Sequence, residues 1–210
     1  MSGLALSLLG QFQAMLDGEP LGSFRTAKVQ ALLIYLAVEG TPQRRESLMT
    51  MLWPGMPEQS ARQNMRQILY YLRRDMPDLP PKPDAGQQAV PILLANRQTI
   101  QLNPLADVSS DVRRFESLIE STQNHDHLDI LLCQACRQNL ESAVALYSGN
   151  FLAYFYLDDS NEFEAWAEVH RQRYSRQALD ALETLTTFAT RGAAYAEARA
   201  YAERQLEIDN

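Results

Sequence analysis

The hydrophobic pattern of this chain changes once, near Pro104, and that change limits the folds open to it. Before Pro104, short apolar runs typical of strands alternate with segments whose apolar residues recur every three or four positions. After it, helical spacing continues to the end, in segments near 109–122, 128–147, 161–190 and 193–208, and we expect no further strand. The chain is therefore predicted to be mainly α, with an α+β first half and an all-helical second half of stacked helix pairs.

The first half is predicted to run in the order sheet, three helices, hairpin. An Asp-Gly pair at 17–18 indicates a turn within a small sheet over residues 4–22. The first helix is expected to be capped by Thr26 and to end before Gly40. A short second helix lies in "RRESLMTMLWPG", and "ILLANRQTIQL" predicts two short strands around a turn at Asn96-Arg97.

Between these lies "SARQNMRQILYYLRR", which carries four arginines and no acid in a chain of formal net charge −7. Ser60 with Gln63 three residues on has the capping-box spacing, which predicts a helix over 61–76. At about 100° per residue, one face is apolar and should be buried. It comprises Met65, Ile68, Leu69, Leu72 and Met76. The remaining surface presents Arg62, Gln63, Arg66, Gln67, Tyr70, Arg73 and Arg74.

This surface is unusual for a solvated helix, which normally mixes acids with bases because opposite charges one turn apart stabilise it. Arginine can bond to guanine edges or phosphate, glutamine can pair with adenine, and tyrosine can reach a phosphate. Residues 1–100 hold ten Lys and Arg against eight Asp and Glu, whereas residues 101–210 hold nine against eighteen. Only the first half suits a polyanion, and we expect its third helix to enter the major groove of double-stranded DNA. A following hairpin, with Arg97 at its tip, completes the order of a winged helix.

At this point the chain resembles a known family. The blocks "LLGQF", "DGEPL", "TAKVQALLIYLAVEG", "RRESLMTMLWP" and "ARQNMRQILYYLRR" are similar to the N-terminal half of transcriptional activators of the Streptomyces antibiotic regulatory protein type. The blocks "DVSSDVRRFESLI", "AVALYSGNFL", "EAWAEVHRQRYSRQALDAL" and "RGAAYAEARAYAERQLEID" resemble that family's bacterial transcriptional activation domain. The resemblance implies a winged-helix DNA-binding domain of the response-regulator type over residues 1–104. It implies a tetratricopeptide-like helical domain over 105–210.

Members of the family bind promoter DNA and help to recruit RNA polymerase, so the resemblance implies a DNA-binding activator, with RNA polymerase or a second copy of the chain as protein partner. It places the recognition helix at 61–76. It also implies phosphate contacts from two other helix starts, namely Thr26, Lys28, Arg44 and Arg45. Arg44 stands where the family often has Ser or Thr, so the second helix is expected to lack a side-chain cap.

Three alternatives compete with this interpretation. A protein-interaction scaffold whose winged helix no longer binds DNA would show no salt-dependent affinity for a duplex. A metal site could form from Cys133 and Cys136 with His125 and His127, but the spacing matches no usual zinc pattern. Buried apolar thiols are the favoured interpretation of the two cysteines. No catalytic triad or phosphate-binding loop indicates an enzyme, so we predict no catalytic residue, metal or cofactor.

The sequence also gives expectations for location and for its aromatic residues. It has neither a membrane-length apolar run nor a signal-peptide pattern, which favours a cytoplasmic protein that does not bind membranes. Trp53 and Trp166 are expected to be core anchors. For the aromatic run Tyr147–Tyr156, packing between helices is favoured over a contact surface for a partner.

Overall fold

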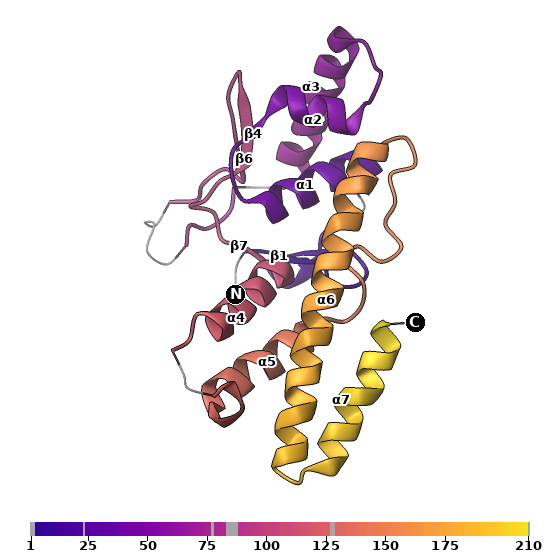
Figure 1. The fold of residues 1–210 in the computed structure, drawn as a ribbon. Coiled ribbons are helices and arrows are strands. Elements are labelled where there is room, and N and C mark those ends of the chain that lie inside the picture. Colours follow the sequence, from indigo (N-terminus) through magenta and orange to yellow (C-terminus); the bar gives the residue numbers. More distant parts are fainter. Residues whose placement is uncertain (1–2, 23, 77, 83–87, 127–128, 210) are drawn as a thin grey trace. The chain divides into compact units, whose positions relative to one another are not determined.

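The computed structural model describes residues 3–22, 24–76, 78–82, 88–126 and 129–209 and is mainly helical (Figure 1). It divides into two compact units. The first unit comprises residues 1–6, 13–110 and 155–167, and the second comprises 7–12, 111–154 and 168–210. The structure thus assigns 155–167 to the first unit, which no periodicity in the sequence indicated. Among the described residues, no helix is both long and apolar enough to cross a bilayer.

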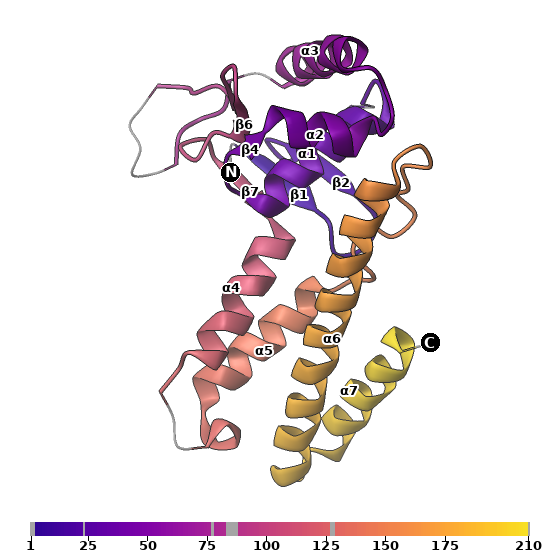
Figure 2. The same ribbon diagram turned by 45° about the horizontal axis from the view of Figure 1, so that its top comes forward.

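The described residues of the first unit form two small sheets, three complete helices and, in residues 161–167, the start of a longer helix (Figures 1 and 2). One sheet has the strand order β3-β2-β1-β7 and the other has the order β4-β6-β5. In chain order the elements are β1 (Leu4–Ser7), β2 (Gln13–Leu16), β3 (Glu19–Pro20), α1 (Ala27–Glu39), β4 (Gln43–Arg44), α2 (Arg45–Leu52), α3 (Glu58–Asp75), β5 (Leu93–Ala95), β6 (Thr99–Leu102) and β7 (Val108–Ser110).

The local signals for α1 and for the β2–β3 hairpin are confirmed. The Thr26 side chain accepts a hydrogen bond from the Val29 amide, and Gly40 ends α1 in the left-handed conformation at φ 66°. Asp17 and Gly18 both have positive φ, at 55° and 90°, as a tight hairpin turn between β2 and β3 requires. The short-range chemistry of caps and turns therefore fixes where these elements begin and end.

The expectation that no strand follows Pro104 is wrong. Residues Val108–Ser110 form β7, which pairs in parallel with β1, with Leu4 opposite Val108. A three-residue strand carries almost no periodic signal. Parallel pairing also depends on a partner about a hundred residues earlier in the chain, so the strand becomes visible only in the folded state.

The segment 155–167 packs against α1 and α2 in the first unit. The Trp166 indole donates a 2.8 Å hydrogen bond to Glu39 and lies 4.9 Å from the Tyr35 ring, centroid to centroid. The Ser160 hydroxyl donates to the Met51 carbonyl at the end of α2. Trp53 is buried, which confirms its role as a core anchor.

The second unit is built from helices, with η1 (Ile130–Leu132) as a short 3₁₀ turn. The α-helices are α4 (Asp111–Gln123), α5 (Gln134–Leu146), residues 168–191 of α6 (Asn161–Arg191), and α7 (Tyr195–Ile208). In both views α4 runs beside α5, and α7 runs beside the later part of α6 (Figures 1 and 2). The Arg204 guanidinium joins α7 to α5 by hydrogen bonds to the carbonyls of Val144 and Tyr147.

The residues 7–12 belong to this second unit because backbone groups of Leu8 and Leu9 bond to it. The Asp111 carboxylate accepts from the amides of Leu8 at 2.8 Å and of Leu9 at 2.9 Å. The Leu8 carbonyl accepts from the Leu152 amide at 2.8 Å. Among the aromatic residues, Phe151 is fully buried here whereas Tyr154 is 87% exposed, so packing explains only part of the aromatic run.

Candidate nucleic-acid interface

The helix α3 presents the predicted polar surface, although it begins earlier than expected. It runs from Glu58 with Pro57 at its N-cap, so the capping box at Ser60 is wrong: Ser60 already lies in the first turn. The apolar face is buried as predicted, and Met76, the residue that follows the helix, is also buried. The residues predicted to contact DNA from this helix are all exposed, namely Arg62, Gln63, Arg66, Gln67, Tyr70, Arg73 and Arg74.

Within α3 itself, the acidic residues lie only at the two ends of the helix. Glu58 pairs with Arg62 at 2.5 Å, and Asp75 pairs with Arg74 at 2.6 Å. Within the described part of the chain, Arg66 and Arg73 form no ion pair. The middle of the exposed face therefore carries two arginines without an ion pair to any described residue.

Arginines from three elements gather on one flank of α3, and we call them the arginine cluster: Arg45, Arg62, Arg66, Arg73 and Arg97. Four of them, all except Arg73, line a depression of about 300 Å³ together with Glu46 and Met49. Arg45 begins α2, Arg62 and Arg66 lie one turn apart on α3, and Arg97 comes from the turn between β5 and β6. The cluster thus combines residues that are up to 52 positions apart in the sequence.

Arg45 is the most constrained member of the cluster. Burial lowers the pKa of its guanidinium, and the nearby charges of Arg73 and Arg66 lower it further. Its Nε atom is buried and has no hydrogen-bond partner among the described residues. A buried donor without an acceptor is costly, and like charges held together add to that cost. An anion bound in the depression would relieve both.

The turn that carries Arg97 is held rigidly. The Asn96 side chain accepts hydrogen bonds from the amides of Gln98 at 2.7 Å and Thr99 at 2.8 Å. The Gln98 carbonyl accepts from the Arg45 amide at 2.9 Å, which ties the turn to the start of α2. Pairing of Arg44 with Thr99 between β4 and β6 adds a second tie. Arg97 is therefore exposed at a fixed place beside Arg45.

On the other flank of α3 lies a cation that the sequence prediction missed, Arg25. The Arg25 guanidinium lies 5.3 Å from the centroid of the Tyr71 ring, and so does that of Arg74. A depression of about 540 Å³ beside them is lined by Arg25 and Gln67, among others. Arg25 precedes α1 by two residues and belongs to no periodic pattern, so only its place beside the aromatic ring distinguishes it.

The remaining predicted contacts differ in how accessible they are. Thr26 is exposed, and its hydroxyl accepts from the Val29 amide, which leaves its proton for another acceptor. Arg44 is exposed and provides no side-chain cap for α2, as expected. The Lys28 ammonium, by contrast, bonds to the Leu52 carbonyl at 2.8 Å and to Asp159 at 2.7 Å. Because the Lys28 ammonium already has these two partners, it is a poor candidate for a phosphate contact.

Comparison with known families bears on the second half of the chain. Residues 110–210 match the family described as the bacterial transcriptional activator domain. That match supports a role for the chain as a bacterial transcriptional regulator. No curated protein sequence matches the chain closely.

Among solved structures, the chain is similar to Mycobacterium tuberculosis EmbR, in a structure described as a complex with a low affinity phosphopeptide. The identity is 18% and the TM-score is 0.64. The similarity covers 99% of this chain and 57% of that one, so this chain spans little more than half the length of that relative. At this identity the likeness shows the fold.

Proposed function

We propose that the chain is a transcriptional activator that binds promoter DNA through α3. In this proposal residues 1–104 form a winged helix, α3 lies in the major groove, and the β5–β6 turn contacts the backbone. The observation that carries the proposal is the arginine cluster. It concentrates positive charge beside an exposed helix, and the described residues offer Arg66 and Arg73 no acidic partner.

Different residues would make different kinds of contact. Gln63, Gln67 and Tyr70 lie on the exposed face of α3, where a groove-bound helix meets base edges. The arginine cluster would bind phosphates along one flank of α3, and Arg25 with Arg74 would bind them along the other. Thr26 stands at the N-terminus of α1, where backbone amides also favour an anion.

The experiment that tests this proposal is fluorescence anisotropy with a mixed-sequence DNA duplex, titrated at several salt concentrations. With about 4–6 phosphate contacts, log K should fall against log salt with a slope of about −4 to −5. The double variant Arg66→Ala/Arg73→Ala should lose about 1.8 units of that slope. Arg199→Ala is the matched control, because Arg199 is an exposed helical arginine of α7 paired with Glu203.

A second copy of the chain or RNA polymerase would then contact the helical half. We infer this role from the acidic charge of residues 101–210, which disfavours DNA, and from the match to an activator domain. Tetratricopeptide-like packing of α4–α7 would present a surface for such contacts. Sedimentation velocity at increasing protein concentration tests whether the chain associates with a second copy. Capture of purified RNA polymerase by the immobilised chain tests whether the two proteins bind. If wild type shows no duplex affinity at low salt, the DNA proposal fails and a protein-interaction scaffold takes its place.

A further inference from the structure

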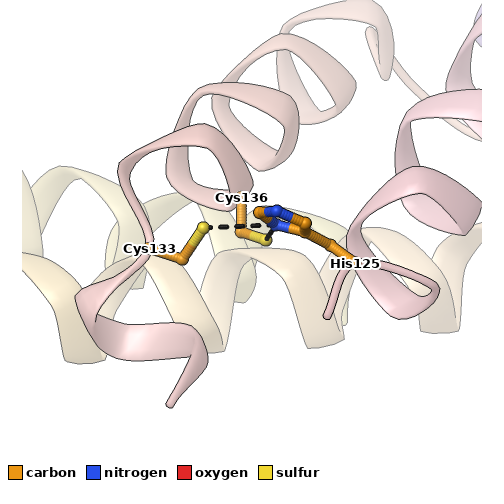
Figure 3. A group of neighbouring side chains, drawn as sticks. All are labelled: His125, Cys133 and Cys136. Carbon is orange, nitrogen blue, oxygen red and sulfur yellow. Dashed lines mark hydrogen bonds between the residues drawn. The ribbon is translucent and has the colours of Figure 1, made fainter. Parts of the chain in front are cut away.

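Three side chains with metal-binding atoms converge in the second unit (Figure 3). His125 follows α4, Cys133 precedes α5, and Cys136 lies in the first turn of α5. The Nδ1 atom of His125 lies 3.1 Å from Cys136 Sγ and 3.3 Å from Cys133 Sγ. All three candidate ligand atoms lie within 4.8 Å of one another.

The backbone holds the two sulfur atoms on the same side of the helix start. The Asp129 side chain accepts from the Leu131 amide at 2.9 Å and so begins η1. The Cys133 amide then donates to the Ile130 carbonyl, and the Cys133 carbonyl accepts from the Arg137 amide in the first turn of α5. Residues three apart across a helix start face the same way.

The burial of the three residues argues against a purely structural role. Cys136 is fully buried, as expected of a small apolar residue. Cys133 is only half-buried and His125 is exposed, yet the imidazole of His125 is turned onto both sulfur atoms (Figure 3). Apolar packing explains Cys136, but it does not explain why an exposed histidine meets two thiols instead of water.

The two nitrogen–sulfur distances are close to those of a tetrahedral zinc site. With Zn–S of about 2.3 Å and Zn–N of about 2.0 Å, tetrahedral geometry separates ligand atoms by about 3.5–3.8 Å. The observed nitrogen–sulfur distances of 3.1 and 3.3 Å need to widen by a few tenths of an ångström. Two thiolates would neutralise the charge of the ion.

We propose that His125, Cys133 and Cys136 bind one Zn²⁺ ion, with water or another small ligand in the fourth position. His127, which the sequence analysis considered with them, lies outside the described residues. The ion would join the segment after α4 to the start of α5 and so stabilise the helical unit. The proposal does not depend on DNA binding, because all three residues lie in the second unit and α3 lies in the first.

The test is a titration of the chelator-treated, full-length chain with Co²⁺ under reducing conditions, followed by displacement with Zn²⁺. We expect one Co²⁺ per chain, a sulfur-to-cobalt charge-transfer band, and the visible spectrum of a tetrahedral site. Cys133→Ser and His125→Ala should each weaken metal binding at least about 100-fold, because loss of an outer-shell partner alone costs 10–100-fold. Both residues lie nearer the surface than Cys136, so the variants should fold.

Gln134→Ala is the matched control, because Gln134 is exposed and lies between the two cysteines. Its metal affinity should equal that of wild type. Absence of the charge-transfer band while both thiols are measured as reduced would overturn the proposal. So would equal affinity of wild type and Cys133→Ser, because the metal would then bind elsewhere.

Discussion

The substitution Arg66→Gln should stabilise the free protein while it weakens binding to DNA. Arg66 lies in the arginine cluster, where its charge and that of Arg73 add to burial in lowering the pKa of Arg45. Glutamine removes the charge but keeps a helix propensity close to that of arginine. The free protein then loses a repulsion that binding to DNA would have balanced.

The size of the gain follows from the neighbours of Arg66. Arg62 lies one turn earlier on α3, and a like-charge pair at that spacing costs about 0.2–0.5 kcal/mol. Repulsion of Arg66 by Arg45 and Arg73 is screened by solvent, as for other charge pairs at a protein surface, and adds a cost of about 0.2–1 kcal/mol in total. We therefore expect the free energy of unfolding to rise by about 0.4–1.5 kcal/mol. For a chain of this size, that raises Tm by about 1–6 °C.

The assay is thermal unfolding of the free protein, paired with anisotropy on the same DNA duplex. The salt slope of DNA binding should become shallower by about 0.9 as one phosphate contact is lost. The stability gain should shrink at high salt, because at about 1 M the screening length is only about 3 Å. Arg199→Gln is the control: it loses its pair with Glu203, so Tm should stay level or fall slightly, and DNA binding should not change.

Two results would refute the reasoning. If Arg66→Gln lowers Tm, Arg66 supports the fold and its weaker DNA binding reflects damage to the helix. If Tm rises but the DNA affinity and salt slope remain those of wild type, the cluster is repulsive but lies outside the interface.

Three further predictions concern stability. Asp111→Ala should lower the free energy of unfolding in urea by about 2–4 kcal/mol, because the buried amides of Leu8 and Leu9 lose their acceptor. Burial raises the pKa of the Asp111 carboxyl despite those bonds, so folding favours its protonated form. The stabilisation that this gives is complete at acidic pH and is lost as pH rises through the raised pKa. The variant Asp111→Asn, which has no titratable group at this position, should not show that loss. Met65→Ala should cost about 2–5 kcal/mol in the same assay, because Met65 is fully buried on the apolar face of α3, whereas Gln63→Ala on the exposed face should change stability by less than about 0.5 kcal/mol. Arg204→Met should speed amide hydrogen exchange in the last turn of α5, because the carbonyls of Val144 and Tyr147 lose the guanidinium that donates to them. Unchanged protection of those amides would show that the two hydrogen bonds do not stabilise this turn.

The sequence was most informative where short-range chemistry decides the outcome. The Thr26 cap, Gly40 and the Asp-Gly turn at 17–18 each act over four residues or fewer, and each is found where it was predicted. The apolar face of α3 was equally clear, because burial repeats with the helical period. The start of α3 was less clear. Ser60 offered a plausible cap, but Pro57, the residue directly before Glu58, is also well suited to precede a helix.

Contacts between residues far apart in the sequence could not be predicted from it. The strand β7 and the segment 155–167 have no pattern of their own that identifies their partners. β7 depends on β1, and the position of Trp166 depends on Glu39 and Tyr35 of α1. These contacts join residues about 100 to 130 positions apart, which a periodicity analysis over a short window does not detect.

The arginine cluster and the His-Cys-Cys group show the same limit at functional sites. Composition and spacing identified the arginines of α3, but they could not show that Arg45 would lie half-buried beside them, with a buried Nε atom that has no hydrogen-bond partner among the described residues. For the cysteines, the two-residue spacing was visible, whereas the seven residues between His125 and Cys133 match no familiar zinc pattern. In the structure the 3₁₀ turn Ile130–Leu132 directly precedes Cys133, whose sulfur lies 3.3 Å from the imidazole. The spacing of ligands in a sequence therefore predicts a metal site only when the backbone between them forms a known turn. For His125 and the two cysteines, the spacing alone did not predict that their side chains meet.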